Sequence, residues 1–191
     1  RNKEYYKKGG PTVTGGEPLL QIDFVTQLFQ KAKEKKIHTC LDTSGITFST
    51  NPNQLAKIDE LIKVTDLVML DIKHMDEAEH KKLTKQSNVP ILAFARYLAD
   101  RKVEVWIRHV VVPGITDKEV YLKQLGAFIA TLGNVKALDV LPYHTMGIVK
   151  YENLGLDYPL KGVPALEKAE AVKARDIILG AYREVKRKNK S

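Results

Sequence analysis

Short apolar runs alternate with longer amphipathic segments along this chain. The apolar runs are rich in β-branched residues and short enough to be strands; they cover residues 11–14, 37–42, 67–71, 103–112 and 137–142. Residues 67–70 and 110–112 are apolar without interruption, as is typical of parallel strands that are covered on both faces. The pattern predicts five strands of a parallel sheet.

The segments between these runs carry apolar residues at helical spacing, three and four apart. Such stripes occur at residues 22–32, 91–98, 122–132 and 174–185. Thr116 and Glu119 have the spacing of a capping box in front of the third stripe. We therefore expect four amphipathic helices, the third capped by Thr116.

Strand, helix and strand in repeated alternation predict an α/β fold with right-handed crossovers. Five strands are too few for a closed eight-stranded barrel, so we expect an open sheet or a partial barrel in one domain over residues 1–191. The first run is short and follows a charged, helical stub. We therefore expect that a further strand belongs upstream of residue 1.

Composition excludes several classes of function. The formal net charge is +8, but the tail from Arg183 to Ser191 contributes much of it, and the basic residues are not interleaved with aromatic ones, so we expect no nucleic-acid partner. No apolar run approaches the roughly 20 residues of a membrane helix, and residues 1–8 lack the apolar segment of a signal peptide. A lone cysteine, Cys40, rules out an internal disulfide and fits a cytoplasmic protein.

Polar side chains gather where the expected strands end. The groups are Gly15-Gly16-Glu17, Asp42-Thr43, Asp71-Ile72-Lys73, Arg108 within the fourth strand, and Tyr143-His144. Ligands of parallel α/β folds bind at this edge of the sheet, so a polar site is expected there. Each group also has a structural explanation: the aspartates could cap helices, the glycines could form a tight turn, and His144 could be a satisfied structural histidine.

The residue types at these strand ends suit a zwitterionic ligand. Glu17, Asp42 and Asp71 can accept hydrogen bonds from an ammonium group, and Lys73, His144 and backbone amides can donate to a carboxylate. Arg108 lies in an otherwise apolar run, so it must face the barrel interior or pair with a carboxylate. An amino acid or a sugar phosphate would be recognised by the same chemistry.

Five blocks of the sequence resemble one enzyme family. They are residues 9–21, 38–45, 65–73, 105–114 and 141–144, with Gly147, Lys150, Tyr151 and Gly155 following the last. Together, and in this order, they are similar to the pyruvate formate-lyase activating enzymes, the glycyl-radical-enzyme activases of the radical S-adenosylmethionine (SAM) superfamily. The turn Gly15-Gly16-Glu17-Pro18 is the block most typical of the superfamily.

The resemblance implies a partial (β/α)6 barrel whose first strand is missing here. It implies SAM contacts from Gly15, Gly16, Glu17, Asp42, Asp71, Ile72, Lys73 and His144. It also implies a monovalent-cation site at Asp42, Thr43 and Asp71, and a substrate-peptide contact at Arg108. The activity implied is formation of a glycyl radical on pyruvate formate-lyase in anaerobic glucose metabolism, with SAM, a [4Fe–4S] cluster and an electron donor such as flavodoxin; the intact enzyme would be a monomer.

One feature departs from this family. Its enzymes hold the cluster with a CxxxCxxC loop, and this chain has one cysteine, which we expect to be a small buried residue. The chain is therefore expected to be a catalytically inactive fragment that keeps much of the SAM site. The alternatives are an activase of another glycyl-radical enzyme, such as a diol dehydratase, and a non-catalytic module that binds SAM or a partner.

Overall fold

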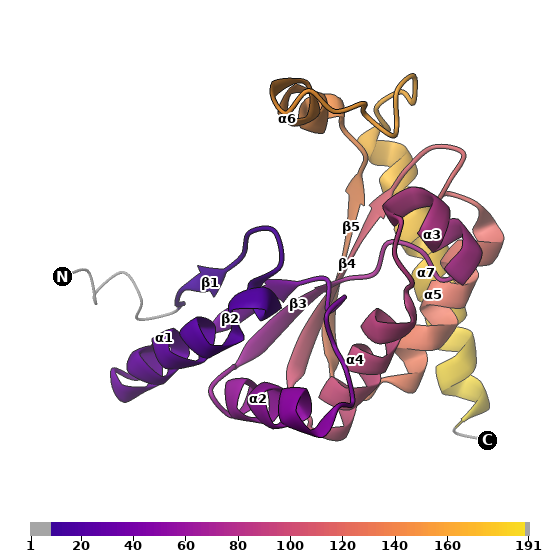
Figure 1. Cartoon of the computed structure of the whole chain (residues 1–191). Coiled ribbons are helices and arrows are strands. Elements are labelled where there is room, and N and C mark those ends of the chain that lie inside the picture. Colours follow the sequence, from indigo (N-terminus) through magenta and orange to yellow (C-terminus); the bar gives the residue numbers. More distant parts are fainter. Residues whose placement is uncertain (1–8, 190–191) are drawn as a thin grey trace. The chain divides into compact units, whose positions relative to one another are not determined.

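The computed structural model describes residues 9–189. Its five strands form one sheet in the order β1-β2-β3-β4-β5, so each strand lies beside its neighbour in sequence (Figure 1). The strands are β1 (Thr12–Val13), β2 (Cys40–Thr43), β3 (Leu67–Asp71), β4 (Glu104–Val111) and β5 (Val135–Pro142). All five predicted strands are present, and the alternation with helices confirms the α/β prediction.

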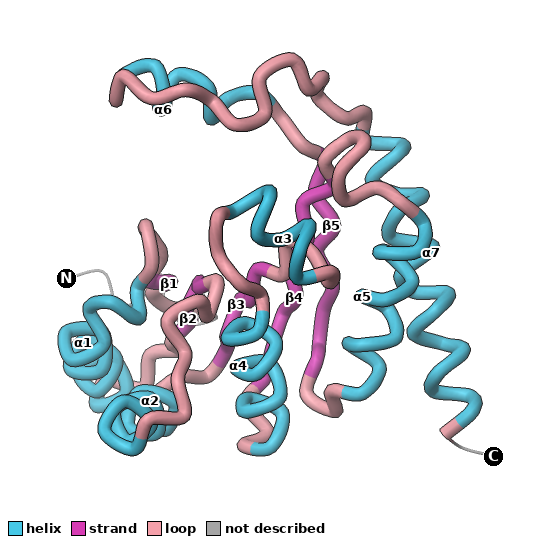
Figure 2. The backbone as a smooth tube through the Cα atoms, turned by 45° about the vertical axis from the view of Figure 1, so that its right-hand side comes forward, coloured by secondary structure: helices cyan, strands magenta, loops and turns pink. Residues whose placement is uncertain are grey.

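Seven α-helices and two short 3-10 helices connect and follow the strands in the described part of the chain. They are η2 (Pro18–Gln21), α1 (Ile22–Glu34), α2 (Pro52–Lys63), α3 (Glu77–Thr84), α4 (Val89–Asp100), α5 (Glu119–Thr131), η3 (Thr145–Gly147), α6 (Ile148–Asn153) and α7 (Lys168–Lys188). The four predicted stripes correspond to α1, α4, α5 and α7. Figure 2 shows that at least one helix lies along the chain between each strand and the next.

The described residues divide into two compact units. Unit 1 contains the residues up to Ile72 together with Ser87–Ile107 and Leu132–Ala137; unit 2 contains Lys73–Gln86, Arg108–Thr131 and the residues from Leu138 onward. Strands β4 and β5 each run through both. The single domain expected from the sequence stays a prediction.

Unit 1 is built on β1, β2 and β3 with α1, α2 and α4. Parallel pairing places Thr12 beside Cys40, and Cys40 beside Leu67. Leu41, Val68 and Leu70 are fully buried, and Leu67 and Met69, which alternate with them along β3, are half-buried. Cys40 is also buried, as expected, and is not part of a disulfide.

Unit 2 contains a close pair of helices, α5 and α7, which run side by side in Figures 1 and 2. The stripe on α7 consists of Ala171, Ala174, Ile178 and Ala181, all buried. Gly126 of α5 makes the close approach possible, because a Cβ atom there would lie 2.2 Å from the carbonyl oxygen of Ile178. Small residues at this crossing therefore set the distance between the helices.

The capping box predicted for α5 is wrong. The hydroxyl of Thr116 accepts a hydrogen bond from Val112 N (2.7 Å) and donates one to Val110 O (3.0 Å). It thereby closes the turn after β4, and α5 begins only at Glu119. The spacing was that of a capping box, but the hydroxyl bonds to the backbone before the helix.

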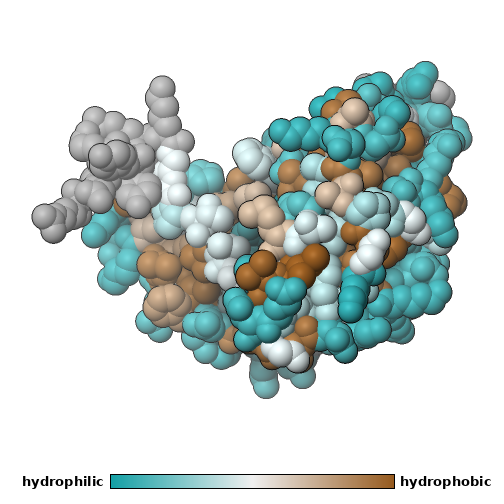
Figure 3. Space-filling model, turned by 90° about the horizontal axis from the view of Figure 1, so that it is seen from above, coloured by the Kyte–Doolittle hydropathy of each residue, from teal (hydrophilic) through white to brown (hydrophobic). Residues whose placement is uncertain are grey.

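The surface carries several exposed hydrophobic residues, and hydrophobic patches break up the polar surface seen in Figure 3. In unit 1 they include Leu20 and Phe24, which are 73% and 61% exposed. In unit 2 Met146, Val149, Leu154 and Leu156 are exposed on and around α6. Within residues 9–189 no helix is both long and apolar enough to cross a membrane.

Candidate functional site

In unit 1 the glycine turn after β1 is fastened to the end of β2. The Thr14 hydroxyl donates a hydrogen bond to Asp42 Oδ2 (3.2 Å). The Glu17 carboxylate accepts hydrogen bonds from the Thr43 hydroxyl and from the hydroxyl and backbone N–H of Ser44 (2.6 and 3.2 Å). These bonds bring together two of the sequence groups expected at the site, Gly15-Gly16-Glu17 and Asp42-Thr43.

The Glu17 carboxylate accepts a fourth hydrogen bond, from Leu19 N (3.2 Å), which caps η2. With four donors already around it, Glu17 serves first to hold the shape of the turn. Gly15 has φ of +132°, a conformation that favours glycine, and a Cβ atom at Gly15 or Gly16 would meet no heavy atom within 4 Å. The backbone at Gly15 and Gly16 is therefore accessible to a ligand, and the neighbouring Glu17 carboxylate is held by its four hydrogen bonds.

Asp42 and Asp71 lie on the same face of the sheet. Asp42 is beside Met69 in the register of β2 and β3, and Asp71 follows Met69 by two residues, so strand alternation points both carboxylates the same way. The Thr43 side chain points to the opposite face, where its hydroxyl also accepts from Gly45 N (2.9 Å). In the cation site predicted at Asp42, Thr43 and Asp71, Thr43 could supply its backbone carbonyl rather than its hydroxyl.

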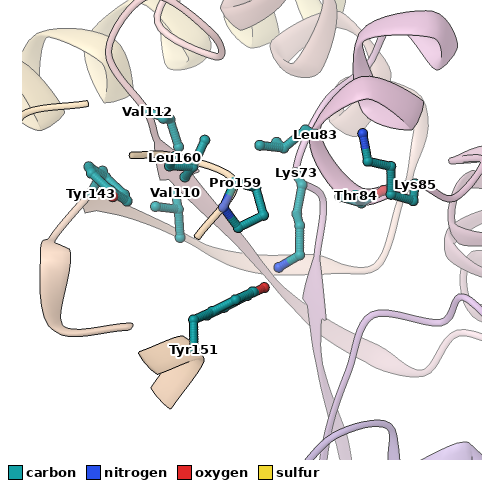
Figure 4. Close-up of a pocket in the computed structure, with 10 residues that line it drawn as sticks. All are labelled: Lys73, Leu83, Thr84, Lys85, Val110, Val112, Tyr143, Tyr151, Pro159 and Leu160. Atoms are coloured by element: carbon teal, nitrogen blue, oxygen red, sulfur yellow. The ribbon is translucent and has the colours of Figure 1, made fainter. Parts of the chain in front are cut away.

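Unit 2 contains a cavity of about 460 Å³ into which Lys73 extends (Figure 4). Its walls are mostly apolar, and its polar groups are two lysines, a threonine and two tyrosines. The lining residues are Lys73, Leu83, Thr84, Lys85, Val110, Val112, Tyr143, Tyr151, Pro159 and Leu160. Figure 4 shows the ammonium group of Lys73 and the hydroxyl of Tyr151 pointing toward one another.

The remaining predicted residues occupy different positions. Ile72 is buried in unit 1. Arg108 is half-buried on β4, on the face that it shares with the cavity residue Val110. His144 is exposed and follows Tyr143, which is buried and lines the cavity. Lys73 is thus the predicted contact that lies in the wall of a cavity.

The residues present suit SAM better than they suit an iron–sulfur cluster. The unit 2 cavity has the size of small-molecule sites, roughly 300–1,000 Å³, and combines apolar walls with a cation. A [4Fe–4S] cluster needs several cysteine thiolates, and Cys40 is alone and buried. Within residues 9–189 no three His, Cys, Asp or Glu side chains are placed to hold a metal ion. The chain as printed therefore does not fit the cluster.

Sequence reasoning did not identify Ser44 or Tyr158. Ser44 follows Asp42-Thr43, and the run of hydroxyl residues after a strand was a usable signal for a carboxylate partner. Tyr158 has no such signal, because it reaches Tyr143 only through the fold of the intervening loop.

The comparisons with known proteins agree on one family. Residues 2–122 match the Radical SAM superfamily. The chain is 48% identical over 170 residues to the pyruvate formate-lyase-activating enzyme of Listeria monocytogenes, covering 89% of the chain and 68% of that protein. It is 54% identical over 155 residues to the Streptococcus mutans enzyme of the same name, covering 81% of the chain and 59% of that protein.

A solved structure shows the same fold. A domain of the pyruvate-formate lyase-activating enzyme from Bacteroides vulgatus superposes with a TM-score of 0.72 and 22% sequence identity, covering 91% of this chain and 94% of that one. The prediction of a partial barrel of the radical SAM type is confirmed by this likeness and by the five parallel strands.

Proposed function

Because the chain belongs to the pyruvate formate-lyase-activating enzyme family of the radical SAM superfamily, we propose that it is the SAM-binding body of such an activase. The observation that carries the proposal is the position of Lys73 in the wall of the 460 Å³ cavity. Lys73 is one of the groups, together with His144 and backbone amides, that are expected from the sequence to donate to the carboxylate of SAM. The apolar walls around it suit the uncharged part of such a ligand.

The glycine turn of unit 1 carries further residues of the predicted SAM contacts. Its open backbone at Gly15 and Gly16 can approach a ligand closely, while Glu17 holds the turn against β2. In this proposal the turn and Asp42 contact the amino-acid part of SAM. Asp71, Ile72 and His144 complete the predicted set, and Arg108 contacts the substrate peptide.

The activity of the complete family member is also part of the proposal. It would form the glycyl radical on pyruvate formate-lyase in the cytoplasm, with flavodoxin as a suitable electron donor. The [4Fe–4S] cluster that the superfamily implies supplies an electron to SAM when bound, and this chain does not hold it. Its own residues would bind and orient SAM and exclude water from it.

The lone cysteine favours a second candidate, a SAM-binding module without catalysis. Both candidates imply that this chain holds no cluster, and anaerobic reconstitution with iron and sulfide tests that shared expectation. We expect no cluster absorbance from this chain. A stoichiometric [4Fe–4S] spectrum would contradict both our view of Cys40 and the non-catalytic candidate.

Calorimetric titration with SAM tests the binding site. We expect Lys73→Ala to weaken binding about tenfold or more, because it removes a charged hydrogen-bond donor, and Asp71→Ala to act in the same direction. The matched control is Lys102→Ala, an exposed lysine after α4. Equal affinity in the wild type and both site variants would refute the assignment.

A further inference from the structure

The segment between β5 and α7 forms a loop whose two ends are hydrogen-bonded. Leu166 N donates to Tyr143 O (2.9 Å), so residues 145–165, which we call the tyrosine loop, leave the end of β5 and return to the same point within unit 2. Gly155, with φ of +64°, ends α6, and Leu156 N donates to Tyr151 O (2.9 Å). The chain can therefore turn back and bring Tyr158 against α6.

Tyr158 connects the tyrosine loop to the end of β5. Its hydroxyl is hydrogen-bonded to the hydroxyl of Tyr143 (2.9 Å), and Tyr143 is buried. The Tyr158 ring also packs edge-on against the ring of Tyr151, with centroids 5.1 Å apart and planes at 73°. Tyr158 thus holds the ring of Tyr151 from one side and is itself held by Tyr143.

Tyr151 brings a polar group to the apolar part of the cavity. It lines the cavity together with Lys73, and its hydroxyl points toward the lysine ammonium in Figure 4. Nearby walls are Val110, Pro159 and Leu160, which offer no side-chain hydrogen bonds. A ligand that reaches Lys73 therefore also comes within reach of the Tyr151 hydroxyl.

We propose that Tyr151 contacts the ligand bound beside Lys73, and that Tyr158, which does not line the cavity, is a positioning residue that fixes the Tyr151 ring. The inference rests on the proposed function, in which this ligand is SAM. A fixed phenol loses less conformational entropy on binding than a free one. Tyr158 therefore raises affinity without touching the ligand.

The Tyr158 hydroxyl stays protonated over the physiological range. Burial raises the pKa of Tyr158 to about 12, and the hydrogen bond with Tyr143 acts in the same direction. The protonated hydroxyl of Tyr158 can donate a hydrogen bond to the Tyr143 hydroxyl or accept one from it. The link between Tyr143 and Tyr158 is thus intact wherever SAM binding would be measured.

A double-mutant cycle tests the inference, with calorimetric SAM affinity as the readout. Tyr151→Phe and Tyr158→Phe each keep the ring and remove the hydroxyl. We expect each to weaken binding roughly fivefold, as for loss of one hydrogen bond or its support. We expect the double variant to bind about as weakly as Tyr151→Phe alone, because Tyr158 acts through Tyr151. Tyr182→Phe on α7, outside the cavity, is the control and is expected to leave affinity unchanged.

The outcomes separate the two proposals. If Lys73→Ala abolishes SAM binding and both tyrosine variants bind as tightly as wild type, the inference is overturned and the SAM site stands. If the two tyrosine effects add in the double variant, Tyr158 is not a positioning residue for Tyr151. If wild-type chain fails to bind SAM, the proposed function fails and the inference falls with it. Unchanged circular dichroism in each variant confirms that folding is retained.

Discussion

At the scale of single residues, carboxylates in unit 1 join segments that are distant in sequence. Glu17 does so at the glycine turn, where it accepts from Thr43 and Ser44. Asp66 does so before β3: it accepts from Thr39 N (2.8 Å) and the Thr39 hydroxyl (3.1 Å), and pairs with Lys33 (2.6 Å). Glu17 fixes the position of the backbone at the end of β2, and Asp66 fixes it at Thr39, before β2 begins; strand pairing alone fixes neither.

Asp66 should make folding sensitive to acid. Although burial opposes ionisation, Lys33 and the donors of Thr39 hold the pKa of Asp66 below its ordinary value of 3.8. A carboxyl with a lowered folded-state pKa contributes stability above its unfolded pKa and loses it as the pH falls through the folded value. We expect the free energy of unfolding to fall below about pH 4, and Asp66→Asn to flatten that part of the profile. Urea titrations at several pH values measure it.

Glu152→Gln is a suitable control, because Glu152 is exposed on α6. It should leave the acid profile as it is in the wild type. If Asp66→Asn and Glu152→Gln give identical profiles, Asp66 does not carry the effect.

Residue chemistry also decides how much of the site the sequence could predict. Lys73 and Asp42 are predicted site residues because they stand at the ends of apolar strands, and the ends of parallel strands share an edge. The hydroxyl groups of Thr43 and Ser44 indicate a carboxylate partner, but the sequence does not identify that partner as Glu17, which is 26 and 27 residues away. Tyr158 was missed for the same reason: its partner Tyr143 lies across a folded loop.

At the scale of elements, the sequence predicts the strands and helices whose apolar residues follow a clear pattern. The bounds of the strand Leu67–Asp71 agree with the prediction, because residues 67–70 form an uninterrupted apolar run that ends at Asp71. Helix α2 was missed because Asn51-Pro52 reads as a loop, whereas Asn51 caps the helix by accepting from Asn53 N (3.0 Å). Helix α3 was missed because it is mostly polar and has one buried residue, His80.

The α5–α7 crossing gives a matched pair of glycine substitutions. Gly126→Ala would place a Cβ atom 2.2 Å from Ile178 O and 2.9 Å from Ala181 Cβ, so the helices must separate. We expect a loss of roughly 2–4 kcal/mol in the free energy of unfolding. Gly180→Ala on α7 meets no heavy atom within 4 Å and should stabilise by about 0.5–1 kcal/mol through helix propensity. Thermal and urea unfolding of both variants would check this, and equal effects would contradict the packing argument.

Lysine occupies the left-handed position after three helices. Lys36, Lys85 and Lys102 have φ of 56°, 63° and 57°, a conformation that costs a non-glycine residue about 1 kcal/mol. We expect Lys102→Gly to raise the free energy of unfolding by about 0.5–1 kcal/mol. Lys102→Ala removes the same side chain without relieving the backbone, so it should give no gain. A gain of equal size in both variants would locate the effect in the side chain.

At the scale of the whole molecule, the surface of unit 1 favours self-association. Strand β1 has two residues and is the first strand in the sheet order, paired with β2 among the described residues. Leu20 and Phe24, on the helices that follow β1 in the chain, are exposed. Open edges and exposed apolar side chains both promote contacts between copies.

We therefore expect sedimentation velocity to show association that grows with protein concentration. Phe24→Lys should shift the chain toward monomer, because it places a charge in the apolar surface. Val172→Lys, at an exposed apolar position on α7, is the matched control and should leave association unchanged. A monodisperse wild-type monomer at all concentrations would contradict the expectation.

The hydrogen bond between Leu166 N and Tyr143 O has a consequence for protein engineering. Because it brings the two ends of the tyrosine loop together, β5 and α7 can be joined by a short linker without stretching the chain. Residues 145–165 are therefore an exchangeable cassette: loops from other members of the family can be grafted between the same two anchor points. Such chimaeras would allow ligand preference to be altered while the sheet and the α5–α7 pair are left untouched.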